Sequence, residues 1–119
     1  MQYSLLIYQT DRQFADRSDP ARRDEANGAF MRYVQALQEA GVLLTTLGIE
    51  PPATVTTVRP SDGTPRVHNG PHANMKAQLG GVCVIEVPDH DAALAWAQRA
   101  PFEHCDVVEL RPTRVVPLA

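Results

Sequence analysis

The predicted fold depends on residues 66–81, which read RVHNGPHANMKAQLGG and lead into the most apolar strand of the chain, residues 82–87. Asn69-Gly70-Pro71 ends a short strand, one helical turn is expected after it, and Gly80-Gly81 enters the next strand. Glycine allows tight bends and close backbone approach, so the chain must bend sharply here. Because donor, acceptor and titratable side chains lie on these bends, we expect the stretch to line any pocket.

The composition is that of one ordinary globular domain, residues 1–119. A chain of this length buries roughly two-thirds of its unfolded surface, enough for a hydrophobic core. Only 6% of the residues are aromatic, and the formal net charge is −3. Nucleic acid and anionic membranes attract basic proteins, so neither is an expected partner. The N-terminal arginines, Arg17 among them, alternate with acidic residues and are interpreted as solvated surface.

The cysteines and the hydropathy of the sequence indicate the cellular compartment in which the protein is expected. Cys83 and Cys105 lie in or beside apolar strand-like runs, which favours buried free thiols over a disulfide. Met1 leads directly into a predicted strand with no signal peptide before it. No apolar run approaches the roughly 18 residues that span a bilayer. These features predict a cytoplasmic protein.

The N-terminal part of the chain is predicted as strand, loop and helix. Residues 3–8 are apolar and form the strand, and residues 9–19 are polar and form a surface loop. Asp19-Pro20 is typical of a helix start, with aspartate as the N-cap and proline in the first turn. The helix ends at Gly41, a residue suited to the left-handed C-terminal position. Its apolar stripe consists of Ala26, Phe30, Tyr33, Val34, Leu37 and Ala40.

The remaining chain combines short strands with one more helix. Asp89 is the predicted N-cap of this helix, and Pro101 ends it. The turn residues 61–64 join two strands into a hairpin. The further strands are predicted at residues 42–47, 54–59, 65–68, 81–87 and 107–112.

This element order predicts an α+β fold, a ferredoxin-like βαββαβ sandwich with an inserted β-hairpin. Both helices then cover the same face of the sheet. Apolar side chains nevertheless point to both faces, since Leu5 and Ile7 alternate with Leu6 and Tyr8. A monomer would leave the second apolar face in water, so we predict a homodimer that covers it.

Several segments also match a known family when they are taken together. They are YSLLIY (3–8), AGVL (40–43), GIEPPAT (48–54), NGPHANMKAQLGG (69–81), VPD (87–89) and VELRP (108–112). In this order and spacing the chain resembles the YCII-related proteins, specifically the branch named for an Asp-Gly-Pro-Phe motif. The resemblance runs nearly end to end and implies a dimeric α/β barrel, in which two ferredoxin-like sheets pack face to face.

The resemblance implies less about activity. Some relatives are small-molecule enzymes, one of them a dechlorinating enzyme of aromatic breakdown, and others are encoded beside sigma factors. Where a His–Asp pair is proposed as catalytic in relatives, the histidine lies on the first helix. This chain has no histidine there, and Phe30 falls near the aligned place. The name-giving motif also differs and reads Asn69-Gly70-Pro71-His72, so an acidic group is lost and an imidazole is gained.

His72 is the candidate for acid–base catalysis, because an ordinary histidine pKa of about 6.5 lets small shifts make it a donor or an acceptor. The alternative is that His72 replaces the packing phenylalanine of the family motif. Lys76 is a candidate to hold an anionic ligand group, and Asn69 to supply a further polar contact. The predicted apolar wall consists of Tyr8, Phe30 and Tyr33.

Other groupings give weaker signals. His68 and His72 are four residues apart, but Pro71 excludes the helix that would bring both onto one metal ion. In His104-Cys105-Asp106, neighbouring side chains of an extended segment point to opposite faces, so the imidazole is not expected to activate the thiol. The sequence contains no phosphate loop, Rossmann glycine signature, paired-cysteine zinc spacing or serine elbow. Neither a metal nor an organic cofactor is expected.

Three functions stay open at this point. The leading hypothesis is a small homodimeric protein that binds a small molecule in a pocket between sheet and loops. The second is a proton-transfer enzyme, isomerase-like or lyase-like, acting on a small oxygenated or aromatic acid with His72 as the base. The third, suggested by the resemblance alone, is an accessory protein of a sigma-factor system. Glu50 either faces the pocket as a further base or is a solvated turn residue.

Overall fold

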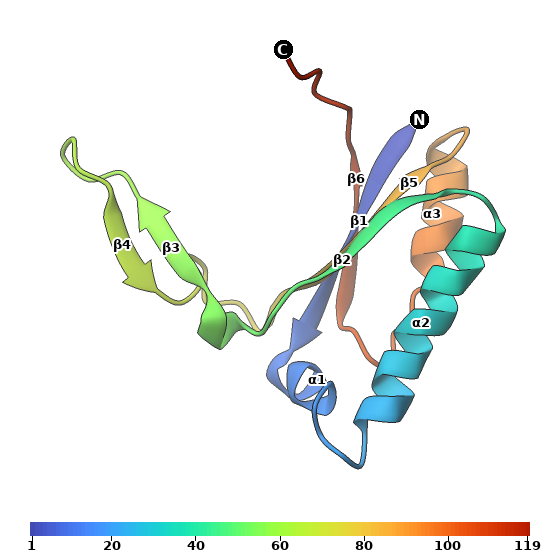
Figure 1. The fold of residues 1–119 in the computed structure, drawn as a ribbon, viewed down its shortest axis with the longest axis horizontal. Helices are drawn as coiled ribbons and strands as arrows, with labels where there is room; N and C mark the ends of the chain where they lie inside the picture. Colours follow the sequence, from blue (N-terminus) through green and yellow to red (C-terminus); the bar gives the residue numbers. More distant parts are fainter.

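The computed structural model describes residues 1–119, and its centre is a four-stranded antiparallel sheet in the order β2-β5-β1-β6. The strands are β1 (Gln2–Thr10), β2 (Leu43–Gly48), β5 (Ala77–Glu86) and β6 (Val107–Pro112). The helices are α1 (Asp11–Asp16), α2 (Arg23–Glu39) and α3 (His90–Gln98). Figure 1 shows α2 and α3 on the same side of the sheet. The arrangement confirms the predicted ferredoxin-like fold with its inserted hairpin.

The hairpin stands apart from this sheet. It consists of β3 (Thr56–Arg59) and β4 (Arg66–Asn69), follows the short 3-10 helix η1 (Pro52–Thr54), and forms a separate two-stranded sheet. At its tip Asp62 and Gly63 have φ angles of 45° and 81°, the left-handed conformation that this tight turn requires. Figure 1 shows the hairpin extending away from the sheet on the side opposite the two long helices.

The hydrophobic core lies between the sheet and the helices. Leu5 is opposite Cys83 on β5 and Leu110 on β6, so the three side chains share the helix-covered face. The Tyr33 hydroxyl of α2 donates to the Trp96 carbonyl of α3 at 2.6 Å, which joins the two helices. The core cluster is Tyr3, Leu5, Ile7, Tyr33, Leu37, Cys83, Ile85, Val87, Ala93, Ala97, Ala100 and Cys105. Both cysteines are therefore buried free thiols, as predicted.

The other face of the sheet has no helix over it. Leu6 is opposite Val82, and Val82 is opposite Leu47, so these apolar side chains form a row across three strands. Leu6 and Val82 are half-buried, and Leu47 is 59% exposed. We call this surface the open face. It confirms the prediction that apolar residues alternate onto both sides of the sheet.

The segment after β1 differs from the predicted loop. It forms helix α1, and the signal for it is a capping box: the Gln13 amide donates to the Thr10 hydroxyl at 3.3 Å, and the Thr10 amide donates to the Gln13 side chain at 2.9 Å. Phe14, 5% exposed, anchors the helix. Asp19 is not the N-cap of α2, because its carboxylate accepts from the Ala21 amide in the preceding turn and α2 begins only at Arg23.

The stretch before β5 differs too. No helical turn follows Pro71; residues 72–76 bend irregularly, and the strand begins at Ala77, four residues before its predicted start. The side-chain amide of Gln78 donates to the carbonyls of Ala73 and Met75, and so provides the bonds that the backbone amides of a helix would otherwise make. Two predicted helix boundaries are confirmed. Gly41 follows the C-terminus of α2 with a φ of 72°, and Asp89 caps the N-terminus of α3 by accepting from the Ala92 amide. None of the helices combines the length and apolar character that a bilayer span requires.

Candidate functional site

A cavity of about 380 Å³ lies between α2 and the sheet. This volume falls within the range of small-molecule pockets, roughly 300–1,000 Å³. Helix α2 contributes Phe30, Tyr33 and Val34 to its wall, and β1 contributes Ile7. Phe30, Tyr33 and Val34 belong to the apolar stripe of α2, and Ile7 belongs to the alternating apolar residues of β1. The apolar pattern that builds the core therefore also lines the cavity.

One end of the cavity is cationic. Arg17, in the turn after α1, donates from Nη1 to the Ile49 carbonyl at 2.6 Å and from Nη2 to the Gly80 carbonyl at 2.6 Å. Its Nη2 also donates to the Gln9 side-chain oxygen. The guanidinium carbon lies 4.7 Å from the centre of the Phe14 ring. Burial lowers the pKa of Arg17, and the charge of Glu50 acts in the opposite direction.

Gln9 and Gly80 hold this end in place. Gln9 is 2% exposed, and its amide donates to the His104 carbonyl at 2.8 Å, which turns its oxygen toward Arg17. A Cβ atom at position 80 would lie 2.5 Å from that oxygen and 2.8 Å from Nη2 of Arg17. A real Cβ atom essentially never lies this close to another atom, so a side chain here would force the ends of Gln9 and Arg17 to shift. The first glycine of Gly80-Gly81 thus leaves the room in which the arginine reaches the backbone of β5.

The titratable side chains inside the cavity are poorly suited to proton transfer at neutral pH. Burial raises the pKa of Tyr33 well above its ordinary value. Burial also raises the pKa of Cys83, against a smaller opposing effect of its hydrogen bond with Thr46. Both groups are therefore protonated at pH 7, and the cavity lining contains no histidine or carboxylate. The cavity suits binding better than acid–base chemistry.

The residues predicted for the site lie in three places. Phe30 and Tyr33 line the cavity. Tyr8 lies beside the open face, where its hydroxyl donates to the Glu109 carboxylate at 2.6 Å. His72 is exposed, and its carbonyl accepts from Arg59 at 2.8 Å. Asn69 is exposed at the end of β4, so one chain alone does not bring these residues into a common pocket.

Lys76 lies in a separate, shallow and polar concavity near the base of the hairpin. It shares this surface with Arg12, Asn74 and Gln78. Sequence reasoning placed the anion-holding role on Lys76 and left Arg17 on the solvated surface. The only sequence signal for Arg17 was indirect, namely the double glycine that leaves room for its side chain.

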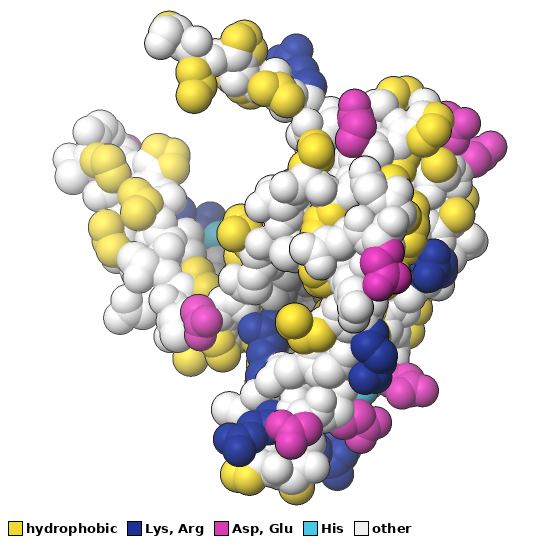
Figure 2. Space-filling view, turned by 45° about the vertical axis from the view of Figure 1, so that its right-hand side comes forward, with side chains coloured by type: hydrophobic (Ala, Val, Ile, Leu, Met, Phe, Trp, Pro, Cys, Tyr) yellow, Lys and Arg dark blue, Asp and Glu magenta, His cyan; other side chains and the backbone are white.

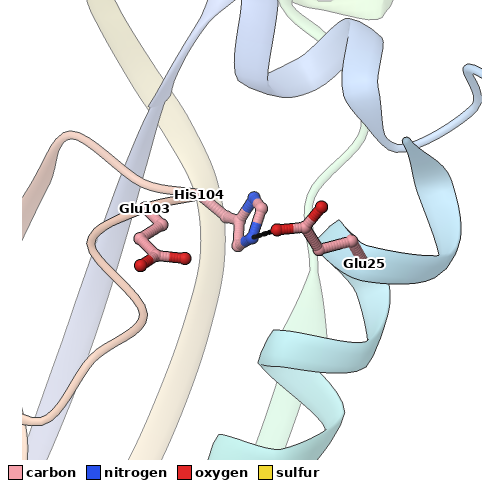
Figure 3. Close-up of side chains that lie close together, drawn as sticks. All are labelled: Glu25, Glu103 and His104. Atoms are coloured by element: carbon pink, nitrogen blue, oxygen red, sulfur yellow. Dashed lines mark ion pairs between the residues drawn. The ribbon is translucent and has the colours of Figure 1, made fainter. Parts of the chain in front are cut away.

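A second cluster lies outside the cavity. Ligand atoms of Glu25, Glu103 and His104 lie within 4.8 Å of one another, and Figure 3 shows the two carboxylates on either side of the imidazole. Nε2 of His104 is 3.9 Å from the Glu25 carboxylate, whose side chain is 75% exposed. These residue types bind divalent cations, but exposed acidic groups commonly gather in this way without a metal. The neighbouring Cys105 is buried, which raises the pKa of its thiol to about 11 and leaves it protonated at pH 7.

Fold and cavity together define a class: ferredoxin-like α+β proteins with a space of small-molecule size between the first long helix and the sheet. The sequence profile of the YCII-related domain matches residues 1–116, and the chain belongs to this family. No curated protein matches the sequence. Among solved structures, the chain is similar to 5-chloro-2-hydroxyhydroquinone dehydrochlorinase (TftG) from Burkholderia phenoliruptrix in complex with 2,5-dihydroxybenzoquinone. The TM-score is 0.54 at 12% identity over 96% of this chain and 94% of the dehydrochlorinase, which establishes a shared fold.

Proposed function

We propose that this protein is a homodimer that binds one small organic molecule per subunit in the cavity between α2 and the sheet. The cavity itself carries the proposal. Concave, mostly apolar spaces of roughly 300–1,000 Å³ with a few fixed polar groups are the usual form of small-molecule sites. A space of about 380 Å³ with aromatic and aliphatic walls and one fixed cation matches this description.

The dehydrochlorinase of the same fold was solved with a single-ring quinone, and this supports a ligand of similar size. Phe30 and Tyr33 offer ring edges and faces against which a flat molecule packs well. Phe30 falls near the place at which the family resemblance puts a catalytic histidine in relatives. An apolar ring at this position favours binding over catalysis.

The surface of the isolated chain supports the homodimer. It exposes 8027 Å², against about 6,400 Å² for a monomeric globular protein of 13.1 kDa, an excess of roughly 1,600 Å². Its radius of gyration is 16.1 Å, against about 13.5 Å for a compact domain of this length. Figure 2 shows a wide hollow between the hairpin, the C-terminal segment and the body of the molecule. An extended chain with an uncovered apolar sheet face is the form that a second subunit would complete.

The two rival functions have weaker support. A proton-transfer enzyme needs an acid or base at the ligand, and His72 lies outside the cavity of its own chain. It would reach a ligand only from the second subunit. The accessory role in a sigma-factor system stays a prediction of the family resemblance, with no surface feature that favours it.

Filling the cavity tests the proposed function. Val34→Trp places a large ring in the cavity from α2, whereas Gln35→Trp adds the same ring at an exposed position of that helix that does not line the cavity. Thermal shift and calorimetry with a panel of single-ring phenols, quinones and aromatic acids should show binding to the wild type and to Gln35→Trp. Val34→Trp should lose it. Equal binding by Val34→Trp, or no binding of any compound to the wild type, would contradict the proposal.

A further inference from the structure

Building on the proposed function, we propose that the ligand of the cavity is an organic anion, a small carboxylate with an apolar ring or chain, and that Arg17 selects it. The carboxylate would lie at the end formed by Arg17 and Gln9. The apolar part would lie along Phe30 and Val34.

Arg17 lacks an anionic partner within the chain. Its three hydrogen bonds all go to neutral oxygens, two backbone carbonyls and one amide. The arginines that form ion pairs elsewhere, Arg22, Arg23 and Arg111, are each more than half exposed. A guanidinium has five N–H groups, so two remain for a further acceptor. Arg17 thus combines partial burial with the lack of a bonded carboxylate.

The charge of Arg17 is only partly solvated, and an anion would stabilise it. Guanidinium stays protonated at any physiological pH, so the site carries one positive charge whatever its surroundings. Partial burial makes the charge unfavourable, as the lowered pKa of Arg17 indicates. A ligand anion would restore the lost solvation, and the reduced dielectric strengthens the attraction between the two charges. A neutral ligand of equal shape gains only the apolar contacts.

The rest of the cavity disfavours a purely inorganic anion. Eight of its fifteen lining residues are hydrophobic, among them Ile7, Phe30 and Val34. Phosphate or sulfate would leave this surface without a partner. Glu50, which is exposed, is the carboxylate whose charge acts on Arg17, although no hydrogen bond joins the two. It weakens the positive potential at the site and would compete with a ligand anion.

Benzoate and benzamide test the inference because they share a ring and a size and differ in charge. Calorimetry on the wild type should show benzoate binding at least about tenfold more tightly than benzamide. Glu50→Gln should strengthen benzoate binding about twofold and leave benzamide binding unchanged. Arg17→Gln should remove the preference. Because Arg17 also holds the backbone of β5, the Glu50→Gln comparison serves as the decisive readout if Arg17→Gln does not fold.

The outcomes separate the two proposals. Equal affinity for the two probes in the wild type, with both lost in Val34→Trp, would overturn the selection of anions while supporting the cavity as a binding site. A benzoate preference that survives in folded Arg17→Gln would overturn the role of Arg17. Binding of neither probe, together with no hit from the wider panel, would overturn the proposed function and this inference with it.

Discussion

At the scale of single residues, Gly80 is the position where the smallest change should have the largest effect. Its missing side chain leaves the space in which Gln9 and Arg17 meet the backbone of β5. Gly80→Ala places a methyl group against a buried amide and a guanidinium held by three hydrogen bonds. Neither partner can move freely, so we expect the free energy of unfolding to fall by about 1–3 kcal/mol. Urea denaturation measures this.

Gly48 provides the matched control. It is also a strand glycine that lines the cavity, but a Cβ atom there meets nothing within 4 Å. Gly48→Ala should therefore change stability by no more than about 0.5 kcal/mol. If both substitutions have the same effect, the close packing at position 80 is not what the glycine provides.

The residue scale is also where sequence reasoning failed most. His72 directly follows Pro71, and Lys76 lies between Pro71 and Gly80, so both draw attention as pocket residues, yet both are exposed. Arg17 lies in a segment of alternating charges, and charge alternation is the usual pattern of a solvated surface. Its partners are backbone carbonyls 32 and 63 positions away in the sequence. A local pattern carries no information about such contacts.

At the scale of elements, the short helix α1 decides where Arg17 lies. A helix of six residues is too short to be stable alone, so its ends and its anchor must fix it. The reciprocal bonds between Thr10 and Gln13 do so at the N-terminus, and buried Phe14 does so in the middle. Loss of the cap should loosen the turn that carries the guanidinium.

Thr10→Ala tests this dependence. It removes the hydroxyl that accepts from the Gln13 amide and should lower the free energy of unfolding by about 1 kcal/mol. Thr10→Ser keeps the oxygen and loses only the methyl group, so it should retain most of the stability. Denaturation of both variants, with amide exchange at residues 11–17, measures the difference. Equal losses in the two variants would show that the methyl group, rather than the cap, matters.

Helices and strands could be predicted from the sequence where the pattern of apolar residues determines them. The strand at residues 107–112 has the predicted bounds, and the stripe on α2 places Tyr33 and Leu37 in the core. Prediction failed at residues 9–19, because a polar run hid a capping box around a single buried aromatic ring. It failed again at Asp19, because an aspartate suited to an N-cap equally suits a turn.

At the scale of the whole molecule, topology could be predicted and the cavity could not. The order of strands and helices leaves few ways to cover one sheet face, and the ferredoxin-like plan is one of them. A cavity instead depends on how far α2 stands from the sheet and on which side chains fill the gap between them. Phe30 and Tyr33 were expected in a pocket wall, but Tyr8, expected beside them, lies in β1 next to the open face.

From the open face we predict that the protein is a dimer at micromolar concentration. Val84 lies on this face, opposite Ser4 and Thr45, and Val84→Lys would put a charge into the proposed interface without touching the core. Ala95→Lys adds the same charge on the exposed side of α3. In sedimentation at about 10 µM, wild type and Ala95→Lys should show twice the 13.1 kDa mass of the chain. Val84→Lys should stay folded and sediment as a monomer, because burying an unpaired ammonium costs several kcal/mol. A monomeric wild type, or a dimeric Val84→Lys, would mean that the open face is not where two subunits meet.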